Sequence, residues 1–337
     1  MEVVAGLSLR NLRPRVWDRR SPEHVPRLRA VMLSHDELGN CPAIYRRVEA
    51  GGFSAVIGTN APNLKIYLDN GAFACLVKNR EPAVEAYKRF VESTQPDWYP
   101  VPADFIPRPS DSLRRQRELF EKTVAVLEAH VGNGFCPVIH AGPWLGPYLD
   151  VIQRLGLTTQ LAVGGLVPHL LNSAGAQRKQ TIEALRGVRK AFPGTIHAFG
   201  IGGLVTLHLA AALGFDSADS SGWRQRAARG LIVLRARGER QAIQLGSWKG
   251  RTLQESEWAE LKRCRCPACR RHGIEGLKSV GVHGFAQRAV HNLAMLLDEA
   301  ALIERHRKAG DFPSWSRRRI RDNRMARLVE LAFEVDA

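Results

Sequence analysis

The residues best suited to chemistry are three closely spaced cysteines, Cys264, Cys266 and Cys269. Three thiolates from one tight turn suit a tetrahedral zinc ion, which needs a fourth ligand. Three nearby histidines could supply that ligand: His272, His283 and His291. His291 lies in the helical stretch RAVHNLAMLL, which could hold it rigidly against the thiolates. Four protein ligands leave no open position, so we expect a structural metal rather than a catalytic one. Unliganded cysteines are the alternative.

Acidic residues form a second chemical feature, because they lie at or near the carboxyl ends of runs that read as β-strands. They are Asp69, Asp104, Asp216 and Asp219. A desolvated carboxylate must find a partner or shift its pKa, so buried strands rarely end in acids without a reason. Two carboxylates facing one pocket can divide nucleophilic and acid–base roles. The alternative is that each aspartate caps the helix that follows it.

The elements that must position these residues alternate between strands and helices. The β-rich runs are 29–34, 65–70, 98–104, 135–140, 160–165, 195–200 and 216–221, and helical stretches include 82–93, 111–131 and 177–191. Such alternation predicts parallel strands joined by right-handed crossovers. Seven or eight units favour an α/β fold of the (β/α)8 TIM-barrel type over an open doubly wound sheet. In that barrel, functional residues lie on the loops after the strands.

The chain divides into three predicted regions. Residues 1–250 form the catalytic barrel and include a hairpin over 231–248. Residues 251–300 form an inserted zinc-binding subdomain with a helix from about 284 to 306, and residues 301–337 form a basic helical tail that packs on the barrel. The arginine-rich run 313–327 is either a solvated helix face or a phosphate-contacting tail.

The charge of the chain points to a polyanionic partner. Lysine and arginine number 49 against 33 aspartates and glutamates, which gives a net charge of +16. Such a protein usually meets nucleic acid, although a basic surface kept for solubility is the alternative. The 45% hydrophobic content excludes wholesale disorder. No apolar run approaches the roughly 20 residues that span a bilayer, and no secretory signal is evident, so we expect a cytoplasmic protein with no membrane partner.

A series of short motifs resembles the tRNA-guanine transglycosylases in order and spacing. The motifs are LDNGAF (68–73), PADF (102–105), PVIHAG (137–142), LAVGGL (161–166), AFGIGG (198–203), FDSADSS (215–221), and CRCPAC with RAVHNL. The similarity runs from about residue 60 to 300. It implies a (β/α)8 barrel with an inserted zinc subdomain. It also implies a glycosyltransferase (a pentosyltransferase) that exchanges guanine in nucleic acid for a 7-deazaguanine base.

The resemblance also implies roles for individual residues. Asp219 matches the nucleophile that forms a covalent glycosyl intermediate, and Asp69 matches the general acid/base. Asp104 matches the acid that reads the guanine edge. Further substrate-binding positions are Asn70, Phe73, His140, Gly164, Gly165, Leu166, Phe199 and Gly200, with the two phenylalanines stacking on the base. His140 stands where the family commonly has a glutamine. Cys264, Cys266, Cys269 and His291 match the ligands of structural Zn²⁺.

Two departures bear on the substrate. The family usually carries SGGFQ after the general acid/base, whereas residues 70–74 read NGAFA, so the pocket glutamine is lost. After the nucleophile, residues 220–224 read SSGWR in place of Cys-Val-x-Pro-Thr-Arg. Both positions lie beside the sugar and the flanking nucleotides. The divergent branch that inserts 7-deazaguanines such as 7-cyano-7-deazaguanine into DNA is therefore the better match, and tRNA is the alternative substrate.

Two further expectations concern partners. Some relatives of this family are non-catalytic subunits that bind nucleic acid, but these typically lose the nucleophile or the base-reading acid. Retention of Asp69, Asp104 and Asp219 favours an enzyme. Members of the family often pair through the zinc region, so the resemblance suggests a homodimer.

Overall fold

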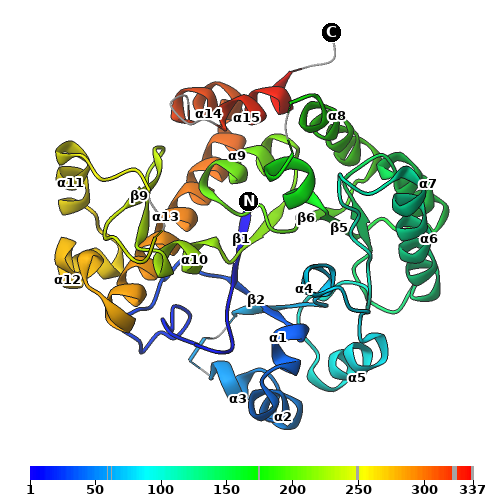
Figure 1. Ribbon diagram of the computed structural model, residues 1–337, viewed down its shortest axis with the longest axis horizontal. Helices are drawn as coiled ribbons and strands as arrows, with labels where there is room; N and C mark the ends of the chain where they lie inside the picture. The colour runs from blue at the N-terminus through cyan, green and yellow to red at the C-terminus, as the bar shows by residue number, and fades with distance from the viewer. Residues whose placement is uncertain (59, 62, 174, 248–249, 321–324, 335–337) are drawn as a thin grey trace.

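Parallel strands form a curled sheet at the centre of the protein (Figure 1). The computed structural model describes residues 1–58, 60–61, 63–173, 175–247, 250–320 and 325–334. The seven strands are β1 (Glu2–Gly6), β2 (Ala30–Ser34), β3 (Lys65–Asp69), β4 (Val138–His140), β5 (Gln160–Gly164), β6 (Thr195–Ala198) and β7 (Ser217–Ser220). Their order in the sheet is β3-β2-β1-β7-β6-β5-β4. This architecture is a TIM-like fold, as the strand–helix alternation predicts.

The two edges of this sheet, β3 and β4, meet through one extended segment. Trp98 forms a parallel bridge with Tyr67 of β3, and Pro100 forms one with Cys136, just before β4. The Leu68 amide donates to the Trp98 carbonyl at 2.9 Å. The prediction of a full strand over 98–104 is wrong, because only these isolated bridges form. Pro100 and Pro102 lack the N–H groups that a continuous ladder requires.

The first strand is the element that the sequence pattern missed. β1 lies between β2 and β7, with Val4 opposite both Ala30 and Asp219. Its five residues, EVVAG, are followed by a long loop and not by a helix. The strand–helix alternation that reveals the other strands is therefore missing here. β1 nevertheless joins the two halves of the sheet, and Val3, Val4 and Ala5 are buried.

Helices surround the strands (Figure 1). Those of the first half are α1 (His35–Gly39), α2 (Pro42–Gly51), α3 (Ser54–Ile57), α4 (Ala72–Lys78), α5 (Val84–Thr94), α6 (Leu113–Ala129) and α7 (Leu145–Arg154). The second half adds a π-helical turn, η1 (Val167–Leu171), and α8 (Gly175–Ala191), α9 (Leu204–Ala212) and α10 (Gly222–Ala228). The amphipathic helices bury their apolar faces against the strands, which produces the main core. A second, smaller cluster consists of Val4, Ala30, Met32 and Tyr67.

The region that carries the cysteine cluster follows the barrel strands. Strands β8 (Leu231–Leu234) and β9 (Gly238–Gln241) form an antiparallel hairpin, as predicted, although Trp248 at the predicted hairpin's end lies outside the described residues. Helices α11 (Glu255–Lys262) and α12 (Pro267–Lys278) come next, followed by the 29-residue α13 (Gly281–Ala309). The predicted helix over 284–306 is confirmed and is longer at both ends. The division of the chain into regions at residues 250 and 300 stays a prediction. Helix α13 continues past residue 300, so no break in secondary structure marks that boundary.

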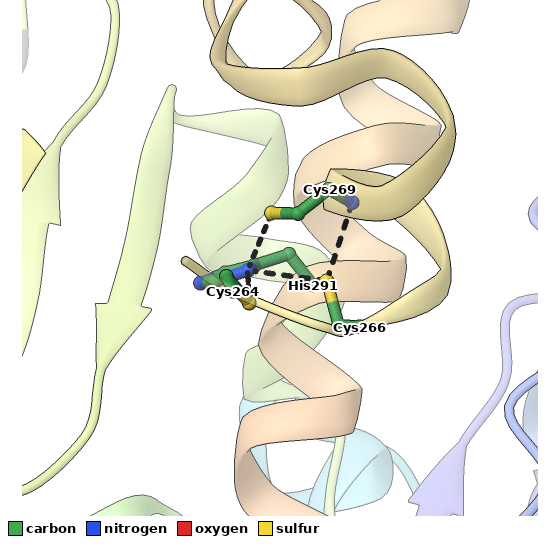
Figure 2. A group of neighbouring side chains, drawn as sticks. All are labelled: Cys264, Cys266, Cys269 and His291. Atoms are coloured by element: carbon green, nitrogen blue, oxygen red, sulfur yellow. Dashed lines mark hydrogen bonds between the residues drawn. The ribbon is translucent and has the colours of Figure 1, made fainter. Parts of the chain in front are cut away.

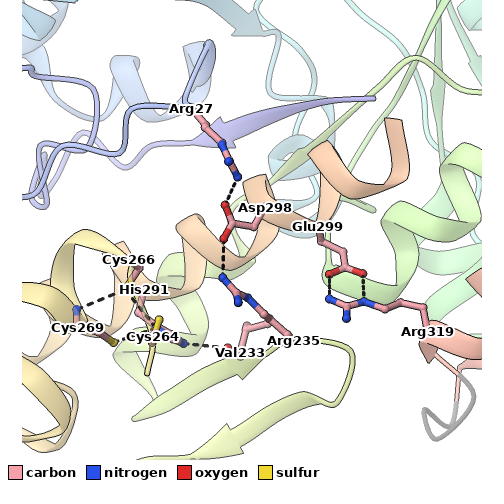
Figure 3. Close-up of polar contacts among 10 residues, drawn as sticks. All are labelled: Arg27, Val233, Arg235, Cys264, Cys266, Cys269, His291, Asp298, Glu299 and Arg319. Atoms are coloured by element: carbon pink, nitrogen blue, oxygen red, sulfur yellow. Dashed lines mark hydrogen bonds and ion pairs between the residues drawn. The ribbon is translucent and has the colours of Figure 1, made fainter. Parts of the chain in front are cut away.

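The C-terminal helices α14 (Phe312–Ile320) and α15 (Ala326–Phe333) pack against the barrel. Two of the tail's arginines bind acids of the same chain: Arg317 pairs with Glu330, and Arg319 makes two hydrogen bonds to the buried Glu299 (Figure 3). Residues 321–324 of the arginine-rich run lie outside the described residues. Within the described part of the chain, no helix combines the length and the apolar character that crossing a membrane requires.

Candidate active site

Three aspartates face one another at the carboxyl end of the barrel. Asp69 is the last residue of β3, Asp219 lies near the end of β7, and Asp104 follows the bridging segment. The pKa of Asp69 is raised to about 7, first by burial and then by the negative charges of Asp104 and Asp219. Hydrogen bonds from Ser34 and the Gly71 amide act in the opposite direction. The parallel barrel therefore gathers carboxylates from distant segments of chain and leaves one of them half-protonated near neutral pH.

Asp104 is buried and held on both oxygens. The Asn70 side-chain amide donates to Asp104 Oδ1 at 2.7 Å and to the Val101 carbonyl at 2.8 Å. His140 Nε2 lies 3.1 Å from Asp104 Oδ2. Gly164, on the neighbouring strand, makes room for this histidine, because an added Cβ would come within 2.7 Å of His140 Nδ1. Asn70, Asp104 and His140 thus form one rigid polar group.

Asp219 is held from the side by the glycine-rich turn after β6. The Gly200 amide donates to Asp219 Oδ1 at 2.7 Å, and Gly200 has the positive φ of 74° that this turn requires. The Gly202 amide donates to the Asp219 carbonyl at 2.8 Å. Among the described residues, no hydrogen bond reaches Asp219 Oδ2. One carboxylate oxygen is therefore fixed and the other is free to react.

The two phenylalanines predicted to stack on a base lie in different surroundings. Phe199 is half-buried, and its ring meets Trp98 edge-on with 5.9 Å between ring centroids. Phe73 lies on α4 with 52% of its surface exposed. No ring contact joins the two within the described residues. Phe73 is accordingly available to a ligand at the mouth of the site.

The predicted backbone-binding residues lie where β5 ends. The Gly164 carbonyl accepts from the Ala141 amide at 3.0 Å, and the Gly165 carbonyl accepts from the His169 amide at 3.2 Å. Leu166 is fully buried and immediately precedes the π-helical turn η1. π-Helical turns are rare overall, but those that occur are often found at functional sites. The chain here changes direction sharply beside His140.

Asp216 does not belong to this group, so its inclusion among the acids at carboxyl strand ends is wrong. It precedes β7 at the amino end of the barrel. There its carboxylate accepts from Arg189 at 2.9 Å and from the Ile196 amide at 2.8 Å. Strand β7 begins one residue later than predicted, and the whole length of the strand separates Asp216 from the site.

His197 is a residue of the site that the sequence pattern did not reveal. It is buried inside the barrel on β6, where its Nδ1 lies 2.9 Å from Ser217 Oγ and its Nε2 lies 3.4 Å from Asp219 Oδ1. Its ring also packs against Trp98 and Phe199. One signal in the sequence could have revealed it: His197 is two residues before Phe199, a predicted site residue, and residues two apart on a strand face the same side.

The three cysteines of the CxCxxC motif lie together with His291 (Figure 2). The Nδ1 atom of His291 lies 3.7, 3.5 and 3.4 Å from the sulfurs of Cys264, Cys266 and Cys269, respectively. The four ligand atoms all lie within 4.8 Å of one another. A tetrahedral ion with bonds of about 2.0–2.3 Å needs ligand atoms roughly 3.6 Å apart. The cluster therefore fits a metal ion, and His291 rather than His272 or His283 completes it.

A second contact fixes the form of His291. Its Nε2 lies 3.0 Å from the Val233 carbonyl on β8 (Figure 3). Because a carbonyl oxygen can only accept, Nε2 carries the proton and Nδ1 keeps its lone pair for the metal. The same contact ties the metal site to the β8–β9 hairpin.

Family comparison agrees with this geometry. Residues 79–325 match the model of the queuine tRNA-ribosyltransferase family, and the chain belongs to that family. No individually curated protein matches the chain significantly. Membership implies a pentosyltransferase-type enzyme that acts on guanine in nucleic acid. The match covers Asp104, Asp219 and the metal ligands but begins after Asp69, Asn70 and Phe73, so the placement of these three rests on the structure.

We predict that replacing Asp104 with Asn lowers the pKa of Asp69, because it removes a nearby negative charge that now raises it. NMR titration of ¹³C-labelled aspartate side chains measures this pKa directly. Asp216→Asn, at the other end of the barrel, is the control and should leave the Asp69 titration unchanged. Equal shifts in the two variants would contradict the convergence of the three acids.

The same shift predicts a pH-dependent stability. The pKa of Asp69 is raised from 3.8 to about 7 in the folded protein, so the folded state binds the proton more tightly. The resulting stabilisation is complete below pH 3.8 and is lost as the pH rises through about 7. Denaturant unfolding should therefore show Asp69→Asn gaining stability relative to the native chain as the pH rises from 3.8 to about 7, with no further gain above that.

Proposed function

We propose that the protein replaces guanine in a polynucleotide with a 7-deazaguanine derivative, such as 7-cyano-7-deazaguanine, through a covalent intermediate on Asp219. The observation that carries the proposal is the pairing of two carboxylates with different properties. Asp219 has one oxygen fixed and one free, and Asp69 has a pKa of about 7. A nucleophile and a group that both gives and takes a proton are the two parts that base exchange requires.

The reaction proceeds in two displacements. Asp219 Oδ2 attacks C1′ of the nucleotide, the bond from C1′ to N9 of guanine breaks, and the leaving base takes a proton from Asp69. The incoming base then gives a proton to Asp69, and its freed nitrogen attacks C1′ and releases the Asp219 carboxylate. The proton that Asp69 lends is returned, so no cofactor is consumed.

Base recognition is assigned to the Asp104 group. A carboxylate has about four lone-pair positions, and Asn70 and His140 engage one on each oxygen. The remaining positions can accept from N1–H and the exocyclic amine of guanine. Phe73 and Phe199 supply the stacking surfaces, and the backbone at Gly164, Gly165 and Leu166 supplies further donors and acceptors at the base edge. A base must leave its stack to reach such a pocket.

DNA is the preferred substrate in this proposal, and tRNA is the alternative. The support lies in Asn70–Ala74 and Ser220–Arg224, which depart from the pattern of the tRNA enzymes beside the site. Ser221 and Gly222 lead directly from β7 into α10, within the stretch where the tRNA enzymes carry Cys-Val-x-Pro-Thr-Arg. The flanking nucleotides therefore meet a different surface.

The metal in the proposal is structural Zn²⁺ held by three thiolates and His291. The donor set fits, since three sulfurs and one imidazole satisfy zinc and leave no site for substrate. A homodimer that pairs through this region is also part of the proposal, supported by the exposed Val280 and Val282 at the start of α13. The barrel over residues 1–250 would then be catalytic and residues 251–300 would be the metal subdomain.

We predict that Asp219→Ala abolishes guanine exchange while polynucleotide binding persists, because the covalent bond to C1′ cannot form. The assay offers guanine-labelled duplex DNA, single-stranded DNA and tRNA, and follows label release with 7-cyano-7-deazaguanine. Asp216→Ala is the matched control. Undiminished exchange by Asp219→Ala would overturn the mechanism, release from tRNA alone would overturn the preferred substrate, and no exchange by the native chain would favour a non-catalytic binding protein.

His197→Phe should lower kcat by about ten- to a hundredfold with little change in KM, because the imidazole positions the nucleophile but does not bind the base. The acidic limb of the pH–rate profile should move as well. Ser217→Ala, which removes the partner of His197 Nδ1, should produce a smaller change of the same kind. A change confined to thermal stability would show that His197 only fills the core.

Cys269→Ser should lose most of the bound metal and lower the unfolding temperature, because a tetrahedral site without one thiolate holds zinc weakly. Elemental analysis of the purified protein measures the zinc content, which should be about one ion per native chain. Cys41→Ser alters a cysteine distant in sequence from the cluster and should retain the metal. Full metal content in Cys269→Ser would remove this site from the proposal.

A further inference from the structure

The loop between β1 and β2 presents a row of arginines without acidic partners. Arg10, Arg13, Arg15, Arg19 and Arg20 are all exposed. Among the described residues, none of their guanidinium groups forms an ion pair. Arginines on the outer helix α6 differ, because Arg114 and Arg115 pair with Glu118 and Arg117 pairs with Glu121. The positive charge of the loop is therefore available to an outside partner.

The acids within the loop do not neutralise these arginines, because they bind backbone amides instead. Glu23 accepts from the Arg15 amide at 2.8 Å, and Asp18 accepts from the Arg20 amide at 2.9 Å. Apolar anchors hold the same segment down: Val16 and Trp17 are buried, and the Trp17 indole donates to the Ile57 carbonyl at 2.8 Å. The loop is a fixed scaffold whose guanidinium groups point outward.

This scaffold is attached to the helix that follows the nucleophile. Arg224 of α10, five residues after Asp219 in the sequence, is buried and donates to the carbonyls of Asn11 and Arg13 at 2.6 and 2.8 Å. Its guanidinium also lies over the Phe285 ring of α13. In Figure 1 the N-terminal segment accordingly runs beside α10 and the start of α13.

The start of the loop lies at the catalytic end of the barrel. A Cβ added to Gly6 would come within 3.2 Å of the Ser220 carbonyl oxygen and Ser221 Cα, one and two residues after Asp219. Ser8 Oγ then donates to Glu37 of α1 at 2.7 Å. Arg10 and Arg13 therefore leave the barrel next to the segment that carries the nucleophile.

We propose that residues 10–20 form a phosphate-binding edge, in which Arg10, Arg13 and Arg15 hold the polynucleotide backbone beside the catalytic pocket. Arg224 is the positioning residue that fixes this edge to α10. Guanidinium groups match phosphate oxygens in charge and geometry. The inference rests on the proposed function, because it supplies the grip that keeps the flanking nucleotides in place while one base is extruded.

The test compares two triple variants of equal charge. Arg10→Gln/Arg13→Gln/Arg15→Gln removes three charges from the edge, and Arg114→Gln/Arg115→Gln/Arg117→Gln removes three from α6, on the other side of the barrel in Figure 1. Both are made in the Asp219→Ala chain, so that binding is measured without turnover. Fluorescence anisotropy gives the affinity for a guanine-containing DNA duplex, a single strand and tRNA at several salt concentrations.

For duplex binding, the slope of log K against log salt should become less steep by about 2 to 3 in the edge variant, because each lost phosphate contact contributes about 0.9 to its magnitude. The α6 variant should change it by less than about 1. Equal changes in the two variants, or no binding by the parent chain, would overturn the inference. Failure of the exchange assay with intact edge-dependent binding would overturn the proposed mechanism alone.

Discussion

Mutual repulsion among carboxylates at one end of a parallel barrel is the constraint on which the site depends. Closing the strands into a ring brings Asp69, Asp104 and Asp219 together from segments that are far apart in the sequence. The electrostatic repulsion among the three carboxylates is offset in a different way at each of them. Asp104 accepts a hydrogen bond from the Asn70 amide and lies beside His140, Asp219 accepts one from a backbone amide, and Asp69 holds its proton to near neutral pH. A division of labour follows from position alone, because three chemically identical side chains acquire three different environments.

Much of this arrangement could be read from the sequence, where the physical signal was local. The CxCxxC spacing determines a thiolate turn whatever surrounds it, and strand–helix alternation reflects a barrel in which each strand is followed by its own covering helix. The helical stretch around His291 favours its choice over His272 and His283, and the family resemblance makes that choice. The structure supplies its physical reason, which is the Val233 carbonyl that orients the ring.

The errors arose where a residue's role depends on distant chain. β1 has no helix after it and is recognisable only by its neighbours β2 and β7. Asp216 and Asp219 are only three residues apart, and the sequence pattern assigns both to the carboxyl end of one short run. Asp216 precedes β7, so only Asp219 reaches the carboxyl end. The prolines at positions 100 and 102 interrupt a ladder that the apolar pattern alone suggests. His197 has no sequence motif, since its partners are brought to it by the pairing of β6 with β7.

Helix α13 connects parts of the molecule that the chain order separates. His291 completes the metal site, and roughly 10 Å further along the same rod Asp298 binds Arg27 of the N-terminal segment and Arg235 of the hairpin (Figure 3). The adjacent Glu299 binds Arg319 of the C-terminal helix α14 and His208 of the barrel helix α9. One long helix thus contacts all of these parts of the chain. The position of this one helix is therefore coupled to the beginning, the middle and the end of the polypeptide at once.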